Sequence, residues 1–164
     1  MLKFNHKTLK LRLFSEKDIP FLKEVYFSTR EPEMKQLPHW SEAMKNAFLE
    51  QQFQAQHSYY QNNYVEAKFW VLENKNERIG RLYYDENVED TIRIIDIALL
   101  PQFQNKGLGT MVLNGIFVRA TEIQKPVSIH VERFNPAKKL YERLGFKMIS
   151  ETNGVYHLME WKNN

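Results

Sequence analysis

The chain has 164 residues, of which 43% are hydrophobic and 26% charged, with six glycines and six prolines. This length suits one domain with a real core, and the composition excludes disordered and collagen-like proteins. The formal charge of +3 comes from scattered residues, so no nucleic-acid or membrane partner is implied, and the lack of cysteine excludes disulfides and thiol nucleophiles. We therefore expect a single domain over residues 1–164.

Neither a membrane span nor a signal peptide is expected from the sequence. No apolar stretch approaches the roughly 20 residues that a bilayer span requires, and residues 1–6 lack the apolar run of a signal peptide. A cytoplasmic location is the resulting prediction. No metal is expected either, because the five histidines, at 6, 39, 57, 130 and 157, form no H-x-x-x-H pair.

The first hundred residues predict one strand, two helices and a group of strands. Leucines alternate with basic residues over 8–14, which indicates a half-buried strand. Ser15 and Asp18 resemble a capping box that opens a helix running to about Phe27, and Ser41 suits the cap of a longer helix. The helix from Ser41 is expected to end near 62–63, and an antiparallel meander of strands is expected at 67–73, 77–84 and 91–100.

After Pro101 the pattern changes to alternating helices and strands. A helix is expected to open at Gly107, and another to stop at Gly145, where glycine is common after a helix. The predicted helices span 107–120 and 136–144, and the predicted strands span 127–132, 146–150 and 155–161. This order predicts an α+β (mixed α/β) fold. The last strand is expected at an exposed edge, where a second copy would form a homodimer.

A strand followed by a glycine-containing helix start is the most informative motif. A helix N-terminus offers unpaired N–H groups that hold a pyrophosphate where no Cβ blocks the approach, although Gly107 and Gly109 also suit a mere tight turn. The pattern Gln104-x-x-Gly107-x-Gly109 resembles the acyl-CoA loop of the GCN5-related N-acetyltransferase (GNAT) superfamily. Asn135 to Phe146, with Tyr141 inside and Leu-Gly-Phe at its end, resembles the second signature of that family.

The resemblance implies a GNAT-like fold: a mostly antiparallel sheet, flanked by about four helices, that splays into a V between strands 91–100 and 127–132. Acetyl-CoA would enter this gap and pass its acetyl group directly to a primary amine of a small molecule, peptide or protein. A non-catalytic acyl-CoA-binding regulatory module is the alternative, because Arg93 and Ile95 stand where many members carry a strand glutamate. The cofactor contacts implied are Leu99 and Leu100 for pantetheine, Gln104, Asn105, Lys106, Gly107, Leu108, Gly109 and Thr110 for the pyrophosphate, and Asn135 for the cofactor arm.

Asp96 is the first candidate for the base, since it is the only carboxylate between Thr91 and Leu100. Alternation would place it on one face with Ile92, Ile94 and Ala98, an apolar setting that raises the pKa of a carboxylate and suits a catalytic role. The alternative is a structural carboxylate that pairs with Arg93 or with a backbone amide.

His130 is the second candidate, because a glutamate occupies the comparable place in the ribosomal-protein N-terminal acetyltransferase branch. It is otherwise a partly buried histidine of the sheet, and Glu132 on the same face is a further option. Tyr141 matches the usual acid of the family, placed beside the departing sulfur, where a hydrogen bond would be its main contribution. The alternative for Tyr141 is a core position, in helical spacing with Ala137 and Leu144.

The amine acceptor is expected to contact the region from Tyr26 to Phe69, where the family places its variable wall. Aromatic residues in and directly after this region would line an acceptor pocket or belong to the core: His39, Trp40, Tyr59, Tyr60, Tyr64 and Trp70. Arg30, Glu31 and Glu33 would hold a charged group of the acceptor or remain as surface charge.

Overall fold

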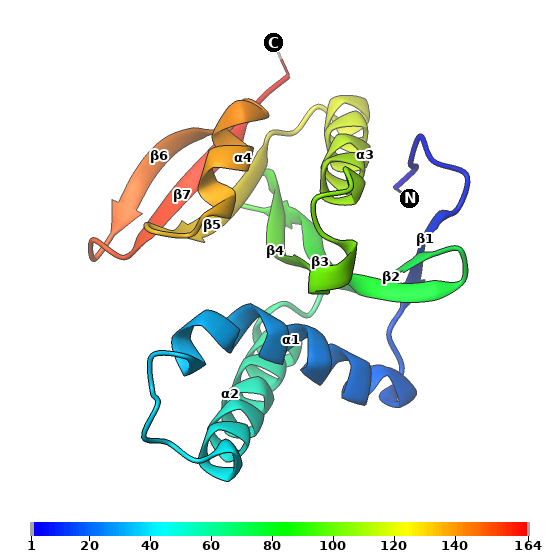
Figure 1. Cartoon of the computed structure of the whole chain (residues 1–164). Coiled ribbons are helices and arrows are strands. Elements are labelled where there is room, and N and C mark those ends of the chain that lie inside the picture. The colour runs from blue at the N-terminus through cyan, green and yellow to red at the C-terminus, as the bar shows by residue number, and fades with distance from the viewer. Residues whose placement is uncertain (1, 164) are drawn as a thin grey trace.

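A seven-stranded sheet runs through the computed structural model, which describes residues 2–163, and helices cover both faces of the sheet (Figure 1). In chain order the elements are β1 (Leu9–Leu13), η1 (Glu16–Asp18), α1 (Ile19–Met34), α2 (Glu42–Asn63), β2 (Lys68–Asn74), β3 (Glu77–Val88), β4 (Thr91–Leu99), η2 (Pro101–Phe103), α3 (Leu108–Ile123), β5 (Val127–Glu132), α4 (Ala137–Arg143), β6 (Lys147–Thr152) and β7 (Tyr156–Trp161), where η marks a 3-10 turn.

The strands lie in the order β1-β2-β3-β4-β5-β7-β6. Every neighbouring pair is antiparallel except β4 and β5, which run parallel with α3 as the crossover between them. A parallel pair needs such a crossover because the chain must return to the same end of the sheet. The predicted mixed fold, with four helices and a mostly antiparallel sheet, is confirmed.

Two hydrophobic cores lie on opposite faces of the sheet. On one face α3 packs its helical stripe of Val112, Ile116 and Ala120, and α4 packs beside it. On the other face α1 and α2 enclose a second core that includes Leu22 and Phe53. Each fully buried side chain of this size stabilises the fold by about 1.5–3 kcal/mol, so both helix pairs are firmly fixed to the sheet between them.

The first helix is longer than the sequence predicts. Asp18 accepts a hydrogen bond from the Ser15 backbone N–H at 2.8 Å, which confirms the capping box. The helix then continues to Met34 instead of stopping near Phe27. Met34 is buried in the core beneath α1 and α2, so tertiary packing extends the helix, even though Pro32 lies within it.

The C-terminal edge of the sheet is β6, not the last strand. β7 pairs with β5 on one side and with β6 on the other, so the prediction that residues 155–161 form an exposed edge is wrong. The hairpin of β6 and β7 folds back toward β5 and inserts β7 into the interior of the sheet. All six residues of β6 are exposed. Self-association stays a prediction.

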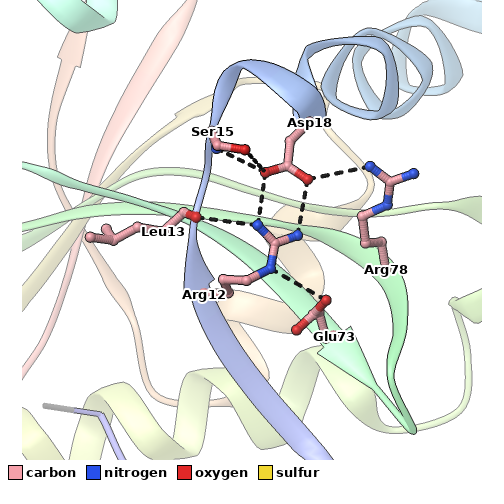
Figure 2. A network of polar contacts seen from close by, with 6 residues as sticks. All are labelled: Arg12, Leu13, Ser15, Asp18, Glu73 and Arg78. Carbon is pink, nitrogen blue, oxygen red and sulfur yellow. Dashed lines mark hydrogen bonds and ion pairs between the residues drawn. The ribbon is translucent and has the colours of Figure 1, made fainter.

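A buried carboxylate, Asp18, ties the first strand to the first helix (Figure 2). It accepts hydrogen bonds from Arg12 Nη1 at 2.8 Å and Arg12 Nη2 at 2.9 Å, and from Arg78 Nη1 at 3.3 Å. Arg12 also lies 3.5 Å from Glu73 on the neighbouring strand. The bond from Arg12 holds the pKa of Asp18 far below its ordinary value, against the opposing effect of burial. We call these residues the Asp18 cluster.

Candidate active site

The sheet opens where β4 and β5 separate. These strands pair only over residues 92–94 and 127–129, although β4 continues to Leu99 and β5 to Glu132. Backbone groups beyond the last pair therefore have no partner across the gap. The predicted V between the two strands is confirmed.

A β-bulge lies at the point of separation. Tyr84 of β3 pairs with Ile94, and the preceding Tyr83 pairs with Asp96, so Ile95 is an extra residue in β4. A bulge shifts the alternation of side chains by one position. Ile92 and Ile94 pack in the core beneath α3, whereas Asp96 faces α1 and α2; the prediction that Asp96 shares their face is wrong.

Asp96 forms an ion pair with Arg81 of β3. The Asp96 Oδ2–Arg81 Nη2 distance is 2.6 Å, and Arg81 Nη2 also donates to Gln56 Oε1 at 3.1 Å. Burial alone would lower the pKa of Arg81, but Asp96, Tyr83 and Tyr60 together raise it. The predicted ion-pair partner Arg93 is therefore wrong. Arg81 is only 2% exposed and lies among the buried residues of β3. A basic residue within such a strand indicates a buried ion pair, and the sequence analysis did not use this signal.

The gap between β4 and β5 contains a cavity of about 120 Å³, which we call the gap cavity. Its lining brings together Asp96, His130, Tyr141 and Asn135, all four of which the sequence singled out. The remaining lining residues are Ile95, Ile97, Ile129 and Val131. Side chains from β4, β5, α4 and the loop before α4 thus converge on one small space.

Tyr141 lies on α4 and is 7% exposed, with its ring edge-on to Phe146 at a centroid distance of 5.6 Å. Burial, and then the charge of Asp96, raises the pKa of Tyr141 to about 12. The phenol therefore keeps its proton at physiological pH and remains a hydrogen-bond donor within the gap cavity.

His130 lies on β5, with an exposed side chain that faces two cavities. Partial burial and then the positive charge of Arg93 lower the pKa of His130 below its usual 6.5. The imidazole is therefore mainly neutral at pH 7 and can accept a proton. Glu132 lines neither cavity and lies 3.8 Å from Arg30.

A second cavity, of about 450 Å³, lies on the side of the gap that faces α2. It shares Ile95 and His130 with the gap cavity, so the two spaces meet at these residues. We call it the tyrosine cavity after four of its lining residues. The lining comprises Tyr59, Tyr60, Tyr64, Arg93, Ile94, Ile95, His130, Thr152 and Tyr156.

Half of the aromatic residues proposed for an acceptor pocket line the tyrosine cavity, namely Tyr59, Tyr60 and Tyr64. Trp40 instead packs edge-on against Phe48 at 5.6 Å, Trp70 packs on the core beneath α3, and His39 lies in the loop between α1 and α2. The sequence analysis did not identify Thr152 and Tyr156 of the hairpin of β6 and β7. No local sequence pattern indicates that these side chains face the tyrosine cavity.

The loop before α3 leaves open space beside its glycines. Gly107 caps the helix with a φ of 80°, a left-handed conformation that favours glycine. A Cβ added to Gly107 would have no neighbour within 4 Å, and one added to Gly109 would meet only Leu99 Cδ1 at 4.0 Å. The N–H groups of the first helical turn have no acceptor within the helix. An open approach to free N–H groups suits a diphosphate.

The predicted pantetheine contacts already take part in hydrogen bonds. The Leu99 carbonyl accepts from Gln104 Nε2 at 2.9 Å, and the Leu100 N–H donates to the Ile79 carbonyl at 2.9 Å. Asn135 Oδ1 accepts from the Ala137 N–H at 2.9 Å, which holds the start of α4 and leaves the Asn135 amide N–H groups for another partner. In the loop before α3 and the first turn of that helix, Leu108 is buried. The side chains there that are exposed or only partly buried include Asn105, Lys106 and Thr110.

Within residues 2–163 no helix has the length and apolar character that crossing a bilayer requires. The same residues contain no group of three or more His, Cys, Asp or Glu side chains arranged to hold a metal ion.

Comparison with protein families identifies the class. Residues 65–148, just over half of the chain, match the model of the acetyltransferase (GNAT) domain. The matched segment contains the bulged strand, the loop before α3 and the helix of Tyr141. The chain therefore belongs to the GNAT acetyltransferases, enzymes that take an acetyl group from acetyl-CoA. No curated protein matches the sequence.

Solved structures share this fold at low sequence identity. The PaiA N-acetyltransferase of Thermoplasma acidophilum, in complex with coenzyme A, is 18% identical, with a TM-score of 0.69 over 96% of this chain and 100% of that one. PH1933 of Pyrococcus horikoshii is 19% identical, with a TM-score of 0.69 over 95% and 99%. A GNAT acetyltransferase of Elizabethkingia anophelis with acetyl-CoA bound is 16% identical, with a TM-score of 0.60 over 96% and 100%.

Proposed function

We propose that this protein transfers the acetyl group of acetyl-CoA to a primary amine that occupies the tyrosine cavity. The observation that carries the proposal is the meeting of the two cavities at His130 and Ile95, with Tyr141 on the far side of the gap. An amine in the tyrosine cavity would reach a thioester in the gap cavity, because the two cavities meet at the side chains of Ile95 and His130.

Acetyl-CoA, when bound, supplies an acetyl group activated as a thioester. The free N–H groups after Gly107 would hold its diphosphate, and the unpaired edges of β4 and β5 would flank its pantetheine arm. The space that a Cβ of Gly107 or Gly109 would occupy is open, which leaves room for the diphosphate to approach the backbone. The residues present therefore fit the group.

His130 is the base in this proposal. An alkyl amine has a pKa near 10.4, so presenting it unprotonated at pH 7 costs about 4.6 kcal/mol. The amine nitrogen becomes strongly acidic as it bonds to the acetyl carbon, and neutral His130 then takes its proton. Asp96 is less suited to this role because one of its oxygens is already paired with Arg81.

Tyr141 donates a hydrogen bond to the sulfur as the carbon–sulfur bond breaks. Complete proton transfer from a phenol of pKa about 12 to a thiolate near 8.5 is uphill by about 5 kcal/mol, so stabilisation by hydrogen bonding is its contribution. His130 returns its proton to solvent, and one proton from solvent converts the thiolate to the thiol. The products are an amide and free coenzyme A.

The first test is a panel of primary amines with acetyl-CoA, scored by release of free thiol and by the mass of the acetylated amine. Tyr141→Phe should lower kcat by about tenfold or more while acetyl-CoA affinity is retained. Tyr84→Phe is a matched control, because Tyr84 is also buried, has a pKa raised to about 12 and lies outside both cavities. Tight acetyl-CoA binding without thiol release from any amine would support a non-catalytic module instead.

The second test is the pH dependence of kcat/KM. Below the pKa of His130 both the amine and the imidazole must lose a proton, so log(kcat/KM) should rise with a slope of about 2, and above it with a slope of about 1. His130→Gln should give a slope of about 1 throughout. His57→Gln is the control, because His57 also has a lowered pKa but stacks on Phe53 outside both cavities. An unchanged break in the His130→Gln profile would remove His130 from the mechanism.

A further inference from the structure

The tyrosine cavity has a buried arginine in its wall. The Arg93 side chain is 7% exposed, and its Nε donates to Ser128 Oγ at 2.8 Å. Glu89 Oε2 lies 3.8 Å from Arg93 Nη2, on a side chain that is 79% exposed. Asp85 pairs with Arg93 in the strand register, but its Oδ1 accepts from the Asn87 N–H at 2.9 Å.

This guanidinium has more donors than the protein satisfies. It carries five N–H groups, and within residues 2–163 its one hydrogen bond goes to Ser128. The contact with Glu89 is beyond hydrogen-bond distance and is screened by solvent. A buried cation is stable only when anionic or polar groups compensate it, so the cavity side of Arg93 is suited to an anion. A carboxylate matches the fork of a guanidinium with two parallel hydrogen bonds.

The other walls suit an apolar body. Tyr59, Tyr60 and Tyr64 come from the end of α2 and its cap, with ring centroids 6.1–6.4 Å apart, and Tyr156 faces them from β7. Tyrosine rings offer apolar contact area together with hydroxyl donors at their tips. Burial raises the pKa of Tyr64, so its hydroxyl remains a donor. The walls therefore combine aromatic surface with donors for an anionic group.

The positions of the polar groups set the shape of a fitting acceptor. His130 lies where the two cavities meet, and Ser128, which accepts the hydrogen bond of Arg93, precedes His130 by two residues on β5. Two residues of strand span about 6.6 Å. An amine beside His130 and an anion beside Arg93 would thus be separated by a body of several ångströms, and the cavity volume of about 450 Å³ suits a small molecule.

We infer that the acceptor is a small primary amine with a carboxylate at the opposite end of an apolar body, and that Arg93 binds this carboxylate and determines specificity. This inference rests on the proposed acetyl transfer, because it places the reactive amine at His130. The apolar body would lie among the tyrosines.

The test compares probes that differ in one charge. 4-(Aminomethyl)benzoate and 4-(aminomethyl)benzamide have the same primary amine and ring, and only the first has a carboxylate. We expect kcat/KM for the benzoate to exceed that for the benzamide by about tenfold to a hundredfold, as for a buried charge-assisted pair. A lysine side chain within a capped acidic peptide presents the same two groups on a larger body, and we expect it to react at least about tenfold more slowly than the benzoate.

Variants assign the preference to Arg93. Arg93→Gln should abolish the preference for the benzoate while the benzamide is still acetylated, and Arg93→Lys should retain part of it, because the charge remains without the fork. Arg143→Gln is the control, since Arg143 is an exposed arginine at the end of α4. Circular dichroism and thermal unfolding of each variant confirm that it is folded before rates are compared.

Calorimetric titration of both probes into the protein with coenzyme A decides the inference independently of turnover. Tighter binding of the benzoate that is lost in Arg93→Gln supports the inference even if no amine is acetylated, an outcome that would refute only the proposed function. Equal affinity of the two probes, or a benzoate preference that survives Arg93→Gln, would overturn the inference and leave acetyl transfer standing. A peptide that reacts as fast as the benzoate would overturn the small-molecule assignment.

Discussion

Two aspartates paired with arginines lie in different parts of this sheet, and they differ in how completely their polar groups are satisfied. In the Asp18 cluster the carboxylate accepts from Arg12, Arg78 and the Ser15 backbone (Figure 2). At the candidate active site, the only side chain of residues 2–163 that pairs with Asp96 is Arg81. Beside this pair, Arg81 Nε and the Tyr83 hydroxyl are buried without a hydrogen-bond partner among residues 2–163.

The difference distinguishes the Asp18 cluster, at the start of α1, from a pair at the candidate active site. The great majority of buried polar groups are satisfied, so each exception calls for an explanation, of which a role in function is one. The Asp18 cluster lies away from both cavities and joins the start of α1 to the neighbouring strands. Asp96 of the other pair lines the gap cavity, and its partner Arg81 has a buried Nε without a hydrogen-bond partner among the described residues.

The largest expected effect is on stability when the site pair is broken. Arg81→Met leaves the Asp96 carboxylate, whose side chain is 16% exposed, without its cation, and we expect a loss of about 3–5 kcal/mol in the free energy of unfolding. Urea unfolding followed by circular dichroism measures this loss.

The double variant Arg81→Met with Asp96→Leu sharpens the prediction. Replacing both charges with apolar side chains removes the unpaired carboxylate, so most of the lost stability should return. A single variant that loses less than about 1 kcal/mol would show that Asp96 is solvated well enough to need no partner, and the contrast with the Asp18 cluster would then disappear.

Asp18→Asn should lower the free energy of unfolding by a smaller amount, about 1–3 kcal/mol. The effect is smaller because Arg12 and Arg78 are 41% and 42% exposed, so water screens their charges. The kinetic constants should remain those of the wild type, since the cluster lines neither cavity. A variant that lost activity in proportion to stability would contradict the assignment of the cluster to structure alone.

The pH dependence of stability tests the same residue. The folded-state pKa of Asp18 is lowered, so its contribution is fully present above its unfolded pKa, near 3.9, and is lost as pH falls toward the folded pKa. Wild-type stability should therefore fall more steeply than that of Asp18→Asn below about pH 4. Parallel curves for the two proteins in this range would exclude the lowered pKa.

The parts of the site encoded in local motifs could be predicted from the sequence. The glycine loop and the helix of Tyr141 follow from residue types at fixed spacing, and the structure places Tyr141 and Asn135 on the gap that these motifs imply. The capping box of Ser15 and Asp18 is equally local and was equally predictable.

The parts that depend on contacts between distant segments could not be predicted. Ile95 is an extra residue in β4, and it moves the side chain of Asp96 to the opposite face of the sheet. A bulge within a run of apolar residues cannot be recognised from the sequence pattern. The partner of Asp96 is Arg81, on another strand, so pairing register decides the contact and sequence proximity does not. Tyr156 reaches the tyrosine cavity only because β7 inserts beside β5.

The smallest expected effect on stability is that of adding a methyl group at Gly109, where the protein leaves space unfilled. Gly109 lies in the first turn of α3, and an added Cβ would meet only Leu99 Cδ1 at 4.0 Å. Gly109→Ala should therefore retain stability or raise it by up to about 1 kcal/mol, because alanine favours a helix. If a diphosphate approaches the backbone here, the new methyl group should weaken acetyl-CoA binding by about tenfold.

Gly115, in the same helix, provides the opposite case. A Cβ there would lie 2.6 Å from Phe4 Cδ1 and 2.9 Å from the Lys3 carbonyl oxygen, so the protein itself occupies the space. Gly115→Ala should lower the melting temperature and leave acetyl-CoA affinity intact. Calorimetry should therefore detect a loss of acetyl-CoA affinity only in Gly109→Ala, and thermal unfolding should detect a loss of stability only in Gly115→Ala. Unchanged acetyl-CoA affinity in Gly109→Ala would mean that the start of α3 is not where the diphosphate binds.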